Sequence, residues 1–148
     1  MSGEYLIQKD NILTVVNKLF VYTDTRNWKG ILDEVFTNEV LFDMTSLAGG
    51  EPANMQASSI TAAWDEGLKP LEAVHHQTGN FDVIIEENAA AVVNCYATAW
   101  HYRPRPSGRN TRVFVGSYIL KLINLPEGWR INAFTFNKKF IDGNLELT

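Results

Sequence analysis

The chain has 148 residues, of which 45% are hydrophobic and 20% are charged, and its formal net charge at pH 7 is −4. This length and composition predict one globular domain and argue against disorder. Phosphate binding needs clustered Lys and Arg, so the acidic balance argues against a nucleic-acid partner. The apolar runs fall well short of the ~18 residues that a membrane span needs, so we expect no membrane partner.

The cysteine content and the N-terminal residues indicate the cellular compartment of the protein. Cys95 is the single cysteine, so no internal disulfide can form and a reducing compartment fits. The opening MSGEYLIQKD lacks the charged and apolar regions of a signal peptide. We therefore expect a cytoplasmic protein.

The first half of the chain predicts helices. Over residues 4–26, apolar side chains recur every three or four positions, which predicts one amphipathic helix with a buried stripe. Asp24 continues the edge of that stripe, four residues after Phe20. The other expected elements are a short helix at 28–35, a short strand at 40–44, a Gly- and Pro-containing loop at 46–54 and a third helix at 58–67.

From residue 71 the pattern changes to long runs rich in β-branched and aromatic residues. Long consecutive strands with short turns predict an antiparallel meander, and helices followed by a sheet predict the α+β class. The expected strands are 71–85, 88–103, 111–123 and 128–140, with turns at 86–88, 104–110 and 124–128.

The chain has three histidines, and all of them lie in expected strands. Side chains alternate across a strand, so the adjacent His75 and His76 point to opposite faces and at most one can enter a shared cavity. His101 ends a face of small residues, which either lets a helix approach closely or lines a hollow. That face carries Ala91, Val93, Cys95, Ala97, Ala99 and His101.

A first helix lying across this face would bring Asp24 to the His101 end. A carboxylate there would orient the imidazole, fix its tautomer and stabilise its protonated form. A second histidine across the cavity would complete a pair of groups able to exchange protons near neutral pH. Taken singly, each residue has a structural alternative: a half-buried histidine satisfied by a neighbour, or an aspartate that caps a helix.

Other chemistry has little support in the sequence. Adjacent strand histidines diverge, so we predict no metal site. Phosphate-binding loops and nucleophile elbows are both missing, and we predict no cofactor. Four arginines surround the loop at 104–110, and a solvated loop is the simplest interpretation, with an anionic ligand or partner as the alternative. They are Arg103, Arg105, Arg109 and Arg112.

The order of elements resembles the cone-shaped α+β domain of the nuclear-transport-factor-like superfamily, within it the SnoaL-like group, and most narrowly the scytalone dehydratase-like branch. The resemblance implies one domain over residues 1–148, with N-terminal helices packed on a curved, mostly antiparallel sheet. The motifs that carry it are YTDTRNW (22–28), VFTNEVLFD (35–43), VHHQTGN (74–80), ATAWHY (97–102), GSYILKL (116–122) and GWRINAF (128–134).

The resemblance also implies a site. It makes His76 the inward, proton-transferring histidine, with Asp24 and His101 as its polar partner pair. Two tyrosines that polarise the substrate carbonyl in the fungal dehydratases are replaced by Thr23 and Met44, so that apparatus is missing here. The predicted substrate-binding residues are Tyr22, Thr23, Met44, Trp64, Asn80, Ala97, Ala99, Tyr118, Phe134 and Phe136.

These residues predict a lyase or isomerase that moves a proton next to a carbonyl of a small cyclic or aromatic molecule. Apolar walls would suit such a substrate. The alternative is a binding domain without turnover, or a subunit-association domain of the same fold. We expect a homo-oligomer, either a dimer or a trimer.

Overall fold

The structure is a computed structural model that describes residues 3–87 and 89–148. Position 88, which ends one expected turn and begins one expected strand, lies outside the described residues. The helical elements are α1 (Gly3–Asp24), α2 (Trp28–Gly30), η1 (Ile31–Val35, a π-helix), α3 (Thr45–Ala48) and α4 (Ala57–Leu68). The strands are β1 (Phe36–Asp43), β2 (Ala53–Gln56), β3 (Ala73–Glu86), β4 (Ala90–Tyr102), β5 (Thr111–Leu125) and β6 (Gly128–Gly143).

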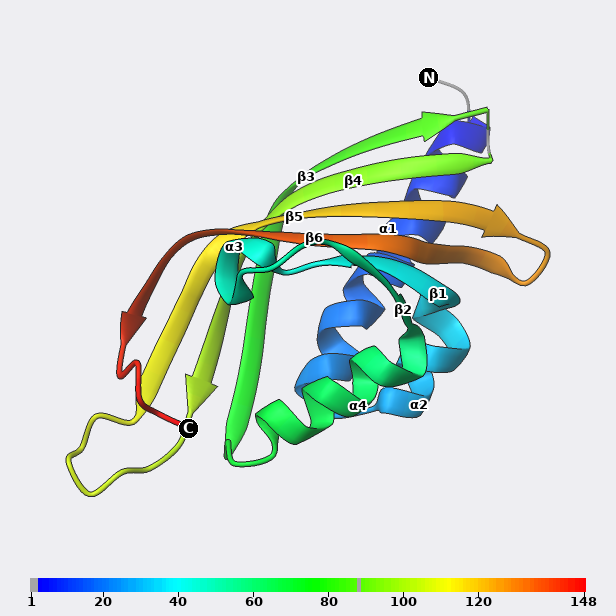
Figure 1. Cartoon of the computed structure of the whole chain (residues 1–148). Helices are drawn as coiled ribbons and strands as arrows, with labels where there is room; N and C mark the ends of the chain where they lie inside the picture. Colours follow the sequence, from blue (N-terminus) through cyan, green and yellow to red (C-terminus); the bar gives the residue numbers. More distant parts are fainter. Residues whose placement is uncertain (1–2, 88) are drawn as a thin grey trace.

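Within the described residues the strands form a six-stranded sheet in the order β2-β1-β6-β5-β4-β3. The meander from β3 to β6 is antiparallel throughout, and the pairing of β1 with β6 is parallel. The sheet curves, and α1 and α4 lie on its concave side (Figure 1). The predicted α+β class, with helices packed on a curved and mostly antiparallel sheet, is confirmed.

Some boundaries differ from the prediction. The first strand begins at Phe36 rather than at residue 40, and the expected loop at 46–54 holds α3 and the start of β2. The strand differences arise from pairing partners, because β1 pairs with β6 on one side and with β2 on the other. Such tertiary pairing overrides local turn chemistry. In the described part of the chain, no helix meets the length and hydropathy of a membrane-crossing segment.

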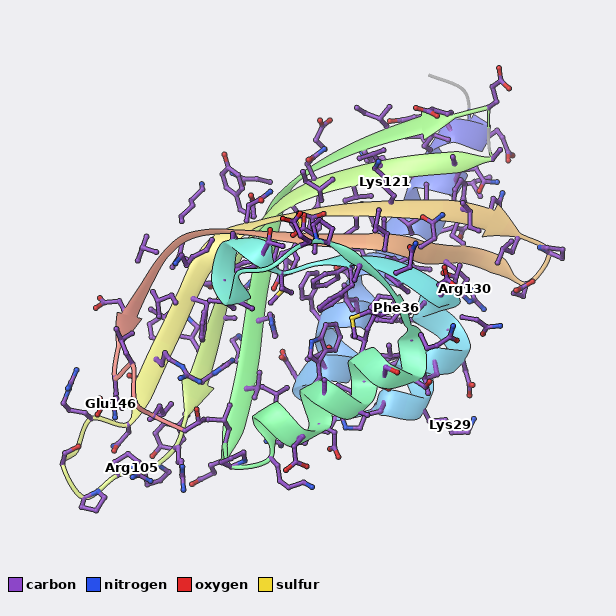
Figure 2. The ribbon with its side chains drawn as sticks, in the orientation of Figure 1. Lys29, Phe36, Arg105, Lys121, Arg130 and Glu146 are labelled. Carbon is purple, nitrogen blue, oxygen red and sulfur yellow. The ribbon has the colours of Figure 1, made fainter. Side chains whose placement is uncertain are left out.

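The core lies between the helices and the concave face of the sheet. The predicted stripe of α1 is buried there, including Ile12, Val16 and Leu19. Phe36 at the start of β1 lies in the same layer, whereas Lys121 lies on the outer side of β5 (Figure 2). The helices thus supply one wall of the interior and the sheet supplies the other.

Strand β4 alternates as the sequence predicts. Its small-residue face is buried, with Val93 and Cys95 almost inaccessible, while Tyr96 and Trp100 on the opposite face are 51% and 46% exposed. Burial raises the pKa of the Cys95 thiol to about 11, so this cysteine is a protonated, inert core residue.

Strand β3 contains a β-bulge. Between the pairs Gly79–Tyr96 and Asp82–Asn94, β3 advances by three residues and β4 by two. Asn80, within the bulge, has a φ of 54°, in the left-handed region. The extra residue resets the alternation, so that Val74 before the bulge and Val83 after it both face the core.

Candidate active site

One end of the interior is a cavity that encloses about 690 Å³, counted to its open mouth. Its walls come from both layers of the fold. The lining residues are Leu19, Phe20 and Thr23 of α1, Met44 and Leu47 at α3, Trp64 and Leu68 of α4, and His76, Ala99, His101, Phe114, Tyr118, Phe134 and Phe136 of the sheet. Nine predicted site residues are among them: Thr23, Met44, Trp64, His76, Ala99, His101, Tyr118, Phe134 and Phe136.

Asp24, the last residue of α1, is bound to His76. Its Oδ1 lies 2.6 Å from Nδ1 of the imidazole, and its Oδ2 accepts the backbone N–H of His76 at 2.9 Å. The two side chains are only 17% and 11% exposed. The expected pairing of Asp24 with His101 is therefore wrong. Strand β3 is an edge strand, so the backbone N–H of His76 needs a partner outside the sheet, and the carboxylate supplies it.

His101 has a cation as its neighbour. Nη2 of Arg112 lies 3.1 Å from its Nδ1, and the Phe114 ring packs 5.0 Å away, centroid to centroid. Burial, and then the positive charges of Arg112 and His76, lower the pKa of His101 to about 4, although the charge of Asp24 acts in the opposite direction. The expected stabilisation of protonated His101 is wrong, because this environment favours the neutral ring.

The sheet register places both imidazoles in one cavity. His76 pairs with Ala99, two residues before His101, so the two histidines are diagonal neighbours on one face. Diagonal neighbours in antiparallel strands are roughly 7–8 Å apart, within reach of one small molecule. His75 pairs with Trp100 on the other face and is exposed, as the alternation predicts.

Tyr118 of β5 lines the cavity between an aromatic ring of α1 and one of β6. Its ring contacts Phe20 at 5.1 Å and Phe136 at 4.9 Å, measured between centroids. Burial, and then the charges of Cys95 and Asp24, raise the pKa of Tyr118 well above its usual range, so it stays a neutral hydroxyl donor. Among the described residues that hydroxyl has no hydrogen-bond partner. A Cβ on Gly116 would lie 2.7 Å from the Phe136 ring, so glycine is what lets that ring pack here.

The structure places three predicted substrate-binding residues outside the cavity. The Tyr22 hydroxyl donates to Glu34 at 2.8 Å, because the residue lies on another side of α1 from Thr23. Asn80 lies within the bulge, which breaks the alternation that would align it with His76. Ala97 is buried within the core and contributes no wall.

Several residues of the site were not predicted. Arg112 shares the inward face of β5 with Tyr118 and is the register partner of His101. Alternation along β5 could have indicated it, but its place at a loop suggested a solvated side chain. The other unpredicted lining residues are Leu19, Phe20, Leu47, Leu68 and Phe114. Within residues 3–87 and 89–148, no three His, Cys, Asp or Glu side chains converge as metal ligands.

A family model described as "SnoaL-like domain" matches residues 4–135. None of the curated proteins matches the chain. Solved structures match over nearly the whole fold. The Kfla4162 protein of Kribbella flavida has a TM-score of 0.90 at 20% identity, with 97% of each chain covered.

Two other similar structures carry names of enzymes. A candidate scytalone dehydratase from Novosphingobium aromaticivorans has a TM-score of 0.80 at 12% identity, covering 96% of this chain and 91% of its own. A hexachlorocyclohexane dehydrochlorinase, LinA-type3 of Novosphingobium barchaimii, has a TM-score of 0.75 at 8% identity, covering 96% and 93%. At these identities the likenesses establish the fold.

Proposed function

Because the chain belongs to the SnoaL-like domain family, we propose that it is a small-molecule lyase or isomerase that moves a proton next to a carbonyl group. The observation that carries this proposal is the Asp24–His76 hydrogen bond at the wall of an aromatic-lined cavity. Two similar structures bear the names of a dehydratase and a dehydrochlorinase. Both names describe eliminations that begin with a C–H bond, which supports the same class of chemistry here.

His76 is the proposed general base. An ionised carboxylate only accepts hydrogen bonds, so Asp24 accepts one from Nδ1–H of His76. The proton therefore stays on Nδ1, and the lone pair on Nε2 is left for the substrate. When His76 takes a proton, the adjacent carboxylate stabilises the imidazolium that forms. Acid–base catalysis by a positioned side chain of this kind contributes roughly 10²–10⁴-fold in rate.

The proposed reaction begins with cleavage of the C–H bond next to the carbonyl. The proton passes to Nε2 of His76, the C–H electron pair forms a C=C bond, and the carbonyl π pair moves onto oxygen as an enolate. His101 and Tyr118 are the proposed hydrogen-bond donors to that oxygen. In dehydration the enolate oxygen pair then re-forms the carbonyl, and the C=C pair moves to the bond between the α and β carbons as the β C–O bond breaks. The His76 imidazolium protonates the departing hydroxyl, which leaves as water. In isomerisation it returns the proton to another carbon.

The lining residues define the substrate class. Rings of Phe20, Trp64, Phe134 and Phe136 form much of the wall, and none of the fourteen lining residues is Asp, Glu, Lys or Arg. Such a cavity favours an uncharged, flat, cyclic or aromatic molecule with a carbonyl oxygen. Excluding water strengthens each hydrogen bond inside it.

The test is deuterium uptake from D₂O into a panel of hydroxylated cyclic and aromatic ketones, followed by NMR and mass spectrometry. We expect uptake or elimination with at least one member, and a loss of about 10²-fold or more in His76→Asn. His75→Asn is the matched control, because it removes the adjacent histidine from the opposite face of β3. Equal rates in the two variants would contradict the proposal. Binding that survives His76→Asn, with no exchange by any panel member, would favour the binding-domain alternative.

We also propose a cytoplasmic location and a homo-oligomer, either a dimer or a trimer. The lone buried thiol of Cys95 is compatible with a reducing compartment. The outer face of the sheet carries exposed apolar and aromatic residues, including Tyr96, Trp100 and Phe140, that a second copy could cover. Native mass spectrometry distinguishes these oligomers from a monomer.

A further inference from the structure

Arg112 is a cation that lies behind His101, outside the cavity lining, and it has no anionic partner among the described residues. It contributes Nη2 to His101 at 3.1 Å, and its guanidinium carbon lies 5.1 Å from the centre of the Phe114 ring. Its Nε is buried and makes no hydrogen bond within the described residues. No carboxylate of those residues forms an ion pair with it. Within the described part of the chain, the one hydrogen bond of its side chain is thus to an imidazole.

This contact fixes the hydrogen positions on His101. A guanidinium carries donors only, so Nδ1 of His101 accepts and cannot itself bear a proton. The neutral ring is then protonated on Nε2, the nitrogen opposite the contact. His101 lines the cavity, so Nε2–H is the donor that remains for a ligand.

We propose that Arg112 is a positioning residue that holds His101 as an Nε2–H donor to negative charge developing on a substrate oxygen. This inference rests on the proposed function and refines it. The positive charge behind the ring makes Nε2–H a stronger donor to an oxyanion. The Arg112–His101 contact thus favours a negatively charged, enolate-like intermediate at the His101 end of the cavity. One such donor is worth roughly 10²–10³-fold in rate in a preorganised site.

The alternative is that His101 acts as an imidazolium acid. The charged and titratable groups facing its ring are Arg112 and Tyr118 of β5, His76 of β3 and Asp24 of α1. Asp24 favours a protonated His101, but its carboxylate is bound to His76. Arg112 is in direct contact and opposes a second proton. The lowered pKa of His101, about 4, agrees with this balance.

The first test needs no substrate. Two-dimensional ¹⁵N NMR of the imidazole rings in the full chain at pH 7 reports which nitrogen of His101 is protonated. We expect Nε2–H in the parent and in Arg112→Lys, which keeps a cationic donor. In Arg112→Met we expect a mixture of tautomers. An Nδ1–H or doubly protonated His101 in the parent spectrum would overturn the inference, even if the variants failed to fold.

The second test uses 4-nitrophenol, whose anion resembles an enolate oxygen and is distinguished from the phenol by its absorbance. The parent should bind the anion in preference to the phenol, and Arg112→Met should lose about tenfold or more of that preference. Lys121→Met is the matched control, since it removes an exposed cation from the outer side of the same strand. An unchanged preference in Arg112→Met would overturn the inference. If both tests succeed and no panel ketone exchanges, the fault lies with the proposed function instead.

Discussion

His76 and His101 are both histidines on one face of the sheet, yet the charged groups bound to them have opposite signs. His76 has a carboxylate 2.6 Å from its Nδ1, and His101 has a guanidinium 3.1 Å from its own. The carboxylate accepts a hydrogen bond from the His76 ring, whereas the guanidinium donates a hydrogen bond to the His101 ring. In the proposed mechanism, one imidazole therefore receives a proton from the substrate, while the other donates a hydrogen bond to it.

The difference originates in the elements behind each strand. β3 lies at the sheet edge, where the end of α1 can reach it, whereas β4 is flanked by β5, which supplies Arg112. Identical residues at neighbouring positions therefore acquire separate roles from topology. Each prediction below tests this difference between the surroundings of His76 and those of His101.

Removing the anion from His76 should have the largest effect. Asp24→Asn keeps the shape of the side chain but loses the charge and permits the wrong tautomer, so the rate should fall by about 10³–10⁴-fold. Deuterium exchange into a panel substrate measures it. Asp82→Asn replaces an exposed carboxylate on β3, the strand that carries His76. This control should exchange deuterium at the parental rate. A loss below tenfold in Asp24→Asn would show that the carboxylate does not assist His76.

Protonating His101 should destabilise the fold. Its pKa is about 4 in the folded chain and about 6.5 when unfolded, so below pH 6.5 the unfolded state binds the extra proton. The free energy of unfolding should therefore fall between pH 6.5 and 4, on the order of 3 kcal/mol from this group.

Urea unfolding at several pH values measures this dependence. His101→Gln should flatten the profile in that window, whereas His75→Gln, at an exposed position, should retain the parental slope. Parallel profiles for His101→Gln and the parent would contradict the assigned environment.

Removing the Tyr118 hydroxyl should have the smallest effect. Tyr118→Phe keeps the ring packing against Phe20 and Phe136 but deletes a neutral donor, so the rate should fall about tenfold. Thermal unfolding should change little, because that hydroxyl has no partner in the described residues. If the rate stays parental, His101 is the sole donor to the substrate oxygen.

Much of the fold followed from periodicity. Alternation along β4 separated the buried small residues from Tyr96 and Trp100, and the stripe of α1 identified its buried face. The cavity walls on β6 followed in the same way, with Phe134 and Phe136 both inward. These patterns are local, and local spacing is what a sequence records directly.

The site pairings did not follow from spacing. Whether Asp24 reaches His76 or His101 depends on how α1 crosses the sheet, which no periodicity in the chain reports. Asn80 was misplaced because one extra residue in β3 is invisible before the register is known. Arg112 was assigned to the loop beside it, although it lies two positions before inward-facing Phe114 and so shares its face of the strand.

The bulge in β3 divides that strand into two segments with independent phase. The hairpin end near Glu86 and the segment that carries His76 are joined through one residue that breaks the alternation. A register slip introduced at the hairpin end can be absorbed at this break before it turns the imidazole outward. We therefore expect the strand to accept an insertion at its tip while the segment that carries His76 keeps its orientation.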